Sequence, residues 1–142
     1  MKLSRYFFVA LIATSLFSCK KDNSNKECSL SEANLLGTYK IGTVKYKQSA
    51  ALPAVDVTSS YDACYLDDTE TFKSDHTVIY TDAGTKCDPA GDDTSTWSLS
   101  GNTLTANGES STVTSFDCSG FTITESNVII TGDSFIATFK KQ

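Results

Sequence analysis

The stretch that decides the fold is Thr96-Trp97-Ser98-Leu99-Ser100-Gly101-Asn102-Thr103-Leu104-Thr105-Ala106. Apolar and polar side chains alternate on both sides of Ser100-Gly101-Asn102, and these three residues are typical of a turn. A period of two is expected of a β-strand that buries one face and exposes the other. Because so short a turn joins antiparallel neighbours, the stretch predicts a β-hairpin.

The same alternation recurs from residue 37 to the end of the chain. We expect strands near residues 37–46, 68–73, 76–82, 95–100, 103–106, 110–117, 120–125, 127–131 and 134–140. Short Gly-, Asn- and Ser-rich segments separate them, so successive strands should pair as an up-and-down antiparallel meander. The expected fold class is all-β, with one short helical turn within residues 31–36. Eight or nine short strands can close into a barrel, which leaves no sheet edge exposed; a two-sheet sandwich is the alternative.

Length and charge limit the classes of function. The 142 residues are enough for one domain, and a hydrophobic content of 39% is too high for a disordered chain. Twelve Lys and Arg against 17 Asp and Glu give a net charge of −5. So acidic a chain lacks the basic surface that phosphate backbones require, and nucleic acid is not an expected partner.

Residues 1–18 have the layout of a signal peptide. Lys2 and Arg5 precede an apolar run, which ends at the small residue Ser18. The run is shorter than the roughly 20 residues that a membrane-spanning helix needs. Removal of this segment would change the net charge from −5 to −7, because Lys2 and Arg5 would be lost.

Leu16-Phe17-Ser18-Cys19 resembles a bacterial lipobox, in which the cysteine receives diacylglycerol and a third acyl chain. Two or more acyl chains, palmitate for example, anchor a protein stably in a membrane. We therefore expect Cys19 to be lipidated, residues 19–30 to be a polar tether, and residues 31–142 to form the barrel domain. A plain secretory signal is the alternative interpretation.

Cys19-Lys20-Lys21-Asp22 resembles the export signal of surface lipoproteins in Bacteroidetes-type bacteria. The expected location is the outer membrane, with the barrel either facing the periplasm or exposed at the cell surface. The alternative is that residues 20–27 are only a solvated tether.

Lipidation of Cys19 leaves four cysteines, which allow three disulfide pairings. The strands expected on either side of residues 73–76 form a hairpin, and Cys64 and Cys87 are nearly equidistant from its turn. We expect a Cys64–Cys87 disulfide for this reason, which leaves Cys28 to pair with Cys118. No CxxC spacing occurs, so we expect no metal site.

Four phrases, taken in their order, resemble the bacterial lipocalin-like domain carried by many small lipoproteins. They are Leu36-Gly37-Thr38-Tyr39-Lys40, Asp68-Thr69-Glu70-Thr71-Phe72-Lys73-Ser74-Asp75, Thr96-Trp97-Ser98-Leu99-Ser100-Gly101-Asn102-Thr103-Leu104 and Ile136-Ala137-Thr138-Phe139-Lys140-Lys141. The resemblance covers residues 35–142 and implies an up-and-down barrel with an apolar interior. The lipocalin signature Gly-x-Trp appears as Gly37-Thr38-Tyr39, and the arginine that packs across that tryptophan has no counterpart here.

Inward side chains of a small barrel either fill it or line a cavity. The aromatic candidates for lining a ligand cavity are Tyr39, Phe72, Tyr80, Trp97, Phe121, Phe135 and Phe139. Acidic residues gather in the two long connections, where we expect a solvated rim rather than a calcium site: Asp62, Asp67, Asp68, Asp88, Asp92 and Asp93. The single histidine, His76, lies in an expected tight turn, and Gly-x-Ser-x-Gly is absent. We therefore expect neither an enzyme nor a cofactor.

These observations lead to one functional hypothesis and one alternative. The first is a lipid-anchored envelope lipoprotein whose barrel binds a small apolar molecule or has a passive surface role. Its partners would be the membrane, through acyl chains on Cys19, and a small apolar ligand. The alternative is a structural or interaction subunit with a filled interior, which binds another envelope protein through residues 37–46 or through the acidic rim.

Overall fold

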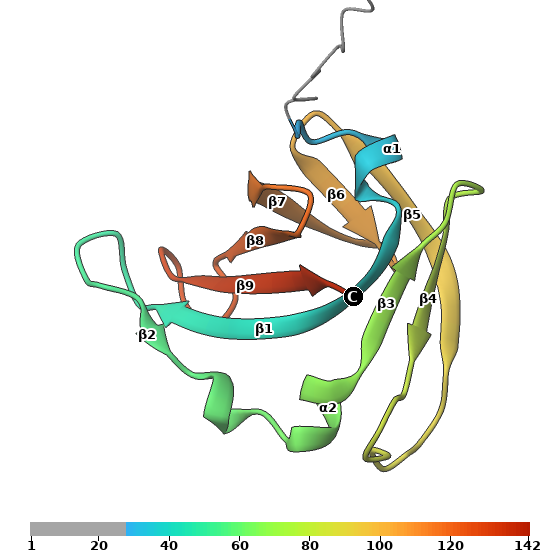
Figure 1. Ribbon diagram of the computed structural model, residues 1–142. Coiled ribbons are helices and arrows are strands. Elements are labelled where there is room, and N and C mark those ends of the chain that lie inside the picture. The colour runs from blue at the N-terminus through green and yellow to red at the C-terminus, as the bar shows by residue number, and fades with distance from the viewer. Residues whose placement is uncertain (1–27) are drawn as a thin grey trace, which may run out of the picture.

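The computed structural model describes residues 28–142, which form an antiparallel β-barrel (Figure 1). The strands are β1 (Gly37–Lys47), β2 (Val55–Asp56), β3 (Thr69–Phe72), β4 (Thr77–Thr81), β5 (Asp93–Ser100), β6 (Thr103–Ala106), β7 (Glu109–Phe116), β8 (Gly120–Ser126) and β9 (Ser134–Lys141). Three short helices are α1 (Glu32–Leu35), η1 (Thr58–Ser60) and α2 (Ala63–Asp67). The expected signal peptide, the lipidation site Cys19 and Lys20-Lys21-Asp22 lie outside the described residues.

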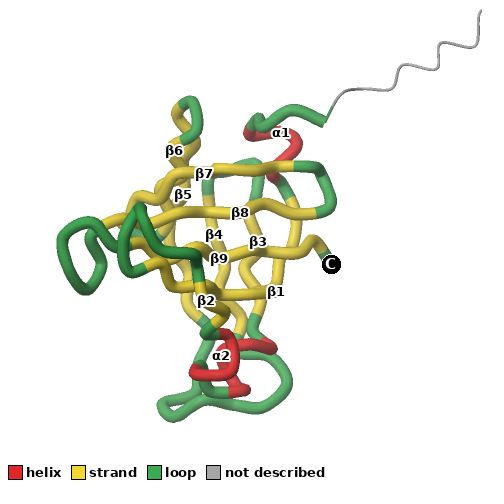
Figure 2. Tube along the Cα trace, turned by 90° about the vertical axis from the view of Figure 1, so that its left-hand side faces the viewer, coloured by secondary structure: helices red, strands yellow, loops and turns green. Residues whose placement is uncertain are grey.

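Hydrogen bonds close the sheet into a ring. The strand order is β2-β1-β3-β4-β5-β6-β7-β8-β9, and β9 also pairs with β1. Eight strands thus form the wall (Figure 2), while β2 adds to the edge of β1 through the pairs Lys45↔Asp56 and Tyr46↔Val55. Every pairing is antiparallel, so the predicted up-and-down barrel is confirmed and the sandwich alternative is wrong.

Residues 127–131 form a loop, and the expectation of a strand there is wrong. The carboxylate of Asp133, which is 2% exposed, accepts the backbone N–H groups of Val128, Ile129 and Ile130 at 2.8 to 3.0 Å. These donors are therefore not available to a sheet ladder. The hydropathy of the loop resembles that of a strand because three aliphatic residues follow one another, but their side chains face solvent.

The connection between β1 and β3 is more ordered than the sequence predicts. The backbone N–H of Val44 donates to the Thr58 hydroxyl at 2.8 Å, and the N–H of Val57 donates to the Val44 carbonyl at 2.9 Å. These bonds hold η1 against β1 beyond the four residue pairs that β1 makes with β3. The chain therefore has helical turns at η1 and α2 in addition to the expected one at α1.

The expected N-terminal helical turn closes one end of the barrel. Ser31 caps α1 by accepting the backbone N–H of Asn34 at 3.3 Å. Gly37 then starts β1 with φ +138°, and a Cβ at this position would meet the side chain of Lys141 at 2.5 Å. Leu35 of α1 is fully buried in the core. None of the helices in the part of the chain that the structure describes is long and apolar enough to cross a membrane.

Aromatic side chains pack beneath α1. The ring of Tyr39 meets the rings of Phe72 and Phe121 edge to face, at centroid distances of 5.9 and 4.9 Å. Trp97 packs against Phe72 at 5.4 Å and donates its indole N–H to the Lys73 carbonyl at 2.9 Å. Such contacts stabilise a core beyond the area that they bury.

A cation does lie over the ring at the lipocalin signature position. The Lys141 ammonium is 5.5 Å from the centroid of the Tyr39 ring, and it donates to the Asn34 carbonyl at 3.3 Å. Only an arginine was expected in this role. Lys141, on the last strand, takes it instead because Lys141 is the register partner of Tyr39.

Candidate ligand-binding cavity

A cavity of about 530 Å³ occupies the barrel. Its wall includes Cys87, Pro89 and Gly91 from the connection before β5, and Asn107 from the turn after β6. It therefore opens at the end of the barrel where α2 lies. Figure 2 shows α1 and α2 at opposite ends of the barrel. Its volume is within the range of 300 to 1,000 Å³ that is usual for small-molecule sites.

The floor of the cavity is apolar. It is formed by side chains that also belong to the core cluster beneath α1, namely Phe72, Val78, Leu104, Phe121 and Phe139. Each has at most 7% of its surface exposed. Alternate residues of a strand point inward, so the phrases that carried the resemblance supply Phe72, Leu104 and Phe139 of this floor.

The wall above the floor carries carboxylates, of which only Asp93 was among the acidic residues expected at the rim. The acidic lining residues are Glu70, Asp82, Asp93, Glu109 and Glu125. The alternation of inward and outward residues could have predicted that Glu70 points inward, since it lies two residues before Phe72 on the same face of β3. Burial raises the pKa of Glu70. The Glu125 carboxylate accepts a hydrogen bond from the Ser111 hydroxyl at 2.7 Å.

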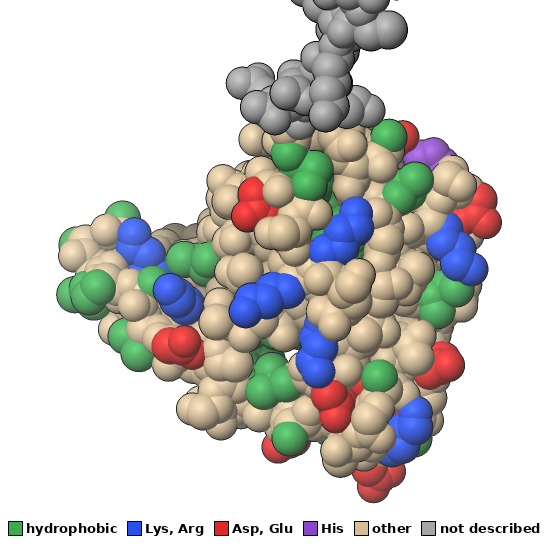
Figure 3. Space-filling view, in the orientation of Figure 1, with side chains coloured by type: hydrophobic (Ala, Val, Ile, Leu, Met, Phe, Trp, Pro, Cys, Tyr) green, Lys and Arg blue, Asp and Glu red, His purple; other side chains and the backbone are tan. Residues whose placement is uncertain are grey.

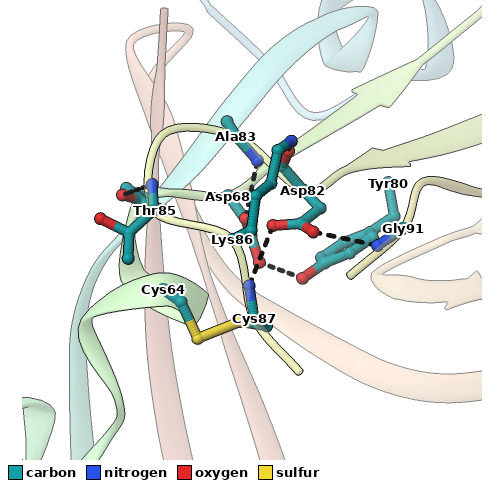
Figure 4. The surroundings of a disulfide bond; sticks show 10 residues. Cys64, Asp68, Tyr80, Asp82, Ala83, Thr85, Lys86, Cys87 and Gly91 are labelled. Carbon is teal, nitrogen blue, oxygen red and sulfur yellow. Dashed lines mark hydrogen bonds between the residues drawn. A yellow bond between two sulfur atoms is a disulfide. The ribbon is translucent and has the colours of Figure 1, made fainter. Parts of the chain in front are cut away.

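Buried carboxylates also organise the rim around the Cys64–Cys87 disulfide (Figure 4). Asp82, which is 2% exposed, accepts the backbone N–H of Gly91 at 2.9 Å and that of Cys87 at 3.4 Å. Asp68 is 5% exposed and accepts the Ala83 N–H at 2.9 Å. A fully solvated acidic rim is therefore wrong for Asp68, because loop backbone groups need its carboxylate as an acceptor.

Tyr80 links the rim to the wall. Its hydroxyl donates to the second carboxylate oxygen of Asp68. Burial raises the pKa of Tyr80, and the hydrogen bond to Asp68 raises it further. The phenol therefore stays protonated and remains a hydrogen-bond donor at neutral pH.

A possible metal site at the rim does not have suitable ligands. Donor atoms of Asp68, Asp82 and Cys87 lie within 4.8 Å of one another. However, Cys87 is bonded to Cys64, so it provides no thiolate. The two carboxylates already accept hydrogen bonds from the loop backbone.

The structure pairs the four described cysteines as Cys64–Cys87 and Cys28–Cys118, which is the pairing expected from the hairpin. Cys64 lies in α2 and Cys87 lines the mouth, so their bond ties α2 to the connection after β4. The second bond joins the segment before α1 to the turn between β7 and β8, at the closed end.

The seven aromatic candidates separate into four groups, the last of which is Tyr39 alone. Four of them line the cavity: Phe72, Tyr80, Phe121 and Phe139. Trp97 belongs to the core next to the floor, where its indole ring contacts Phe72. Phe135 packs against Tyr46, at a centroid distance of 5.1 Å, and is not among the lining residues.

Tyr39 lines a small recess of about 20 Å³, which shares Glu70, Tyr80 and Phe139 with the cavity wall. The residue is fully buried, and its hydroxyl has no hydrogen-bond partner. Burial raises the pKa of Tyr39 to about 12.

His76 lies in the expected turn, between β3 and β4 at the closed end of the barrel. Its exposed imidazole packs against the Trp97 ring at a centroid distance of 5.4 Å, so it does not lie at the mouth of the cavity.

Comparison with known families agrees with this architecture. The profile of the lipocalin-like domain matches residues 35–140. The chain belongs to the lipocalin-like domain family. The match extends from Leu35 of α1 through Lys140 of β9, so it includes every wall strand and all residues that line the cavity of this lipocalin-like protein. No curated protein and no solved structure matches the chain.

Proposed function

We propose that this lipocalin-like protein is a lipid-anchored envelope lipoprotein whose barrel binds a small, largely apolar molecule and catalyses no reaction. The observation that carries the binding role is the cavity of about 530 Å³ with its floor of Phe72, Phe121 and Phe139. A floor of this kind stabilises a bound apolar group by about 25 cal/mol for each Å² removed from water. Membership in the lipocalin-like family supports the same role.

The anchoring role is supported by the lipobox-like residues 16–19 and by the position of Cys28 in the barrel. Cys28 is bonded to Cys118 at the closed end, where α1 lies, whereas the cavity opens at the end where α2 lies. Figure 1 shows α1 and α2 at opposite ends of the barrel. A tether that leaves from the closed end keeps the mouth accessible. The proposed location is the outer membrane, with the barrel in the periplasm or at the cell surface.

A fluorescence titration tests the binding role. The chain of residues 20–142 contains every described residue and lacks the acylated cysteine, so acyl chains cannot compete. We expect a neutral apolar probe such as N-phenyl-1-naphthylamine to bind at about one equivalent, with transfer of excitation from Trp97. No saturable binding would exclude an apolar ligand site.

Mass spectrometry of the mature protein from the native host tests the anchor separately. We expect the N-terminal residue to be Cys19 with two or three acyl chains. A mature chain that begins elsewhere, or an unmodified cysteine, would exclude lipidation. A Cys19→Ala variant should no longer partition with the membrane.

A second candidate, contact with another envelope protein, is favoured by one surface. Val128, Ile129 and Ile130 are 48%, 66% and 47% exposed, on a loop that Asp133 fixes in place. The proposed use of residues 37–46 as an open edge is less favourable, because β1 already pairs with β2, β3 and β9. Cross-linking from Ile129 in intact cells, compared with an equivalent position on β7, would test this contact.

A further inference from the structure

The cavity segregates charge. Every lining residue that carries a charge is an Asp or a Glu, and no Lys or Arg is among the residues that line it. Of the seven lysines in residues 28–142, five belong to β1 and β9. Lys141 lies over the Tyr39 ring at the closed end and does not line the cavity. Figure 3 shows Lys side chains at the outer surface of the molecule. The interior of the barrel therefore has a negative potential that no lining cation offsets.

Glu70 has no partner that favours its charge. It is the register partner of Tyr39, so the two side chains lie next to each other on the inner face. Burial alone accounts for the raised pKa of Glu70, with no hydrogen bond or cation acting against it. A partly buried charge without a partner destabilises the folded protein.

The Tyr39 hydroxyl gives an independent indication of a missing group. It is fully buried, it lines the recess next to Glu70, and it has no hydrogen-bond partner. A buried polar group without a partner destabilises the folded protein. A ligand that places a hydrogen-bond donor between Tyr39 and Glu70 would satisfy both side chains.

We propose that the ligand is a cationic amphiphile, an amine protonated at neutral pH that carries an apolar chain or ring system. This inference rests on the proposed binding function and names its ligand class. The apolar part occupies the floor over Phe72 and Phe121, and the ammonium group donates to the Glu70 carboxylate and the Tyr39 hydroxyl. Glu125, which the Ser111 hydroxyl orients, adds a second negative charge on the wall. Anionic lipids, fatty acids among them, are disfavoured because no lining cation would compensate their carboxylate.

Displacement of the neutral probe from residues 20–142 tests this proposal. Three competitors share one chain length and differ in charge at pH 7: dodecylamine, dodecanol and dodecanoate. We expect dodecylamine to displace the probe at a concentration at least about tenfold lower than dodecanoate, with dodecanol between them. Equal displacement by dodecylamine and dodecanoate would overturn the proposal while the binding function remains. Failure of the probe itself to bind would instead refute the binding function on which the proposal rests.

Two charge-neutralising variants test whether the preference for dodecylamine depends on Glu70. Glu70→Gln should remove most of the advantage of dodecylamine over dodecanol, with each competitor measured against the probe affinity of the variant itself. Glu32→Gln, in α1 at the closed end, removes the same charge outside the cavity and should have no effect. An equal loss in both variants would overturn the assignment, because it would indicate a general charge effect. Far-UV circular dichroism shows whether Glu70→Gln is folded; if that variant does not fold, Glu125→Gln provides the same comparison.

Discussion

Asp133 is the residue that most clearly explains why residues 127–131 form a loop although their sequence pattern predicts a strand. Its carboxylate accepts three backbone N–H groups and the Tyr46 hydroxyl, the latter at 3.1 Å. Burial alone would raise the pKa of Asp133, but the hydrogen bonds from Ile130, Ile129, Val128 and Tyr46 outweigh it and hold the pKa below its ordinary value. The charged form is therefore the one that stabilises this loop.

The first prediction concerns Asp133→Asn. An amide has one acceptor oxygen, so we expect backbone hydrogen exchange at residues 128–130 to become roughly tenfold faster at pH 7. Because the pKa of Asp133 is depressed in the folded state, its contribution is present above 3.8 and is lost as the pH falls below that value. The wild-type loop should therefore open on acidification, and the variant should lack this pH dependence. Equal exchange in both proteins at pH 7 would contradict the role assigned to Asp133.

The second prediction concerns the stability cost of Glu70. Since burial raises its pKa, the folded protein favours the neutral carboxyl, and ionisation at neutral pH destabilises it. Glu70→Gln should raise the melting temperature of the ligand-free protein at pH 7, and the difference should shrink as the pH falls towards 4.5, the ordinary value. Differential scanning calorimetry from pH 4.5 to 8 measures this difference in melting temperature, with Glu32→Gln as the control. A lower melting temperature for Glu70→Gln at pH 7 would show that the carboxylate is structural.

At the scale of elements, the two disulfides stabilise opposite ends of the barrel. Cys64–Cys87 closes a loop of sequence separation 23, and Cys28–Cys118 one of separation 90. Replacing both cysteines of a pair by Ser should lower the free energy of unfolding by about 3 kcal/mol for the first pair and about 4.5 kcal/mol for the second. Urea denaturation measures both.

The same two variants differ in what they do to the cavity. Loss of Cys64–Cys87 frees the connection that carries Pro89 and Gly91, so probe affinity should fall. Loss of Cys28–Cys118 affects the closed end and should leave probe affinity unchanged in the folded protein. Equal effects on affinity would indicate that the mouth does not depend on its disulfide.

Eight of the nine expected strands were predictable because alternation reports which face of a strand is buried. It failed at residues 127–131, since hydropathy cannot show that Asp133, two residues further along, is buried and takes the N–H groups of the loop. It also failed at β2, which depends on its pairing with β1, and at η1, which depends on the hydrogen bond that the Val44 N–H donates to the Thr58 hydroxyl. The same alternation could have predicted the carboxylates of the wall, since Glu70 shares the face of Phe72. It was not used in this way because an acid on an inner face contradicts the expectation of an apolar interior.

At the scale of the whole molecule, the sequence predicted closure but not whether the barrel was hollow. Closure follows from short connections and the need to pair edge strands. The cavity depends instead on the summed volume of inward side chains, and several of these are small: Ser95, Ala106 and Ser111 all line it. The period-two alternation indicates that such positions point inward, but it does not give the distance to the opposite wall of the barrel. The volume of the interior could therefore be determined only from the structure.

Filling the interior tests whether the cavity is the binding site. Ala106 lines the cavity on β6, next to Trp97 in register, so Ala106→Phe should project a ring into the space over the floor. We expect probe affinity to fall at least about tenfold, while the free energy of unfolding changes by less than about 1.5 kcal/mol, because the new ring enters empty volume rather than a packed core. Ala50→Phe adds the same ring in the exposed loop between β1 and β2 and should change neither quantity. If Ala106→Phe folds and still binds the probe with wild-type affinity, the probe occupies the outer surface and the barrel interior is not where this protein holds its ligand.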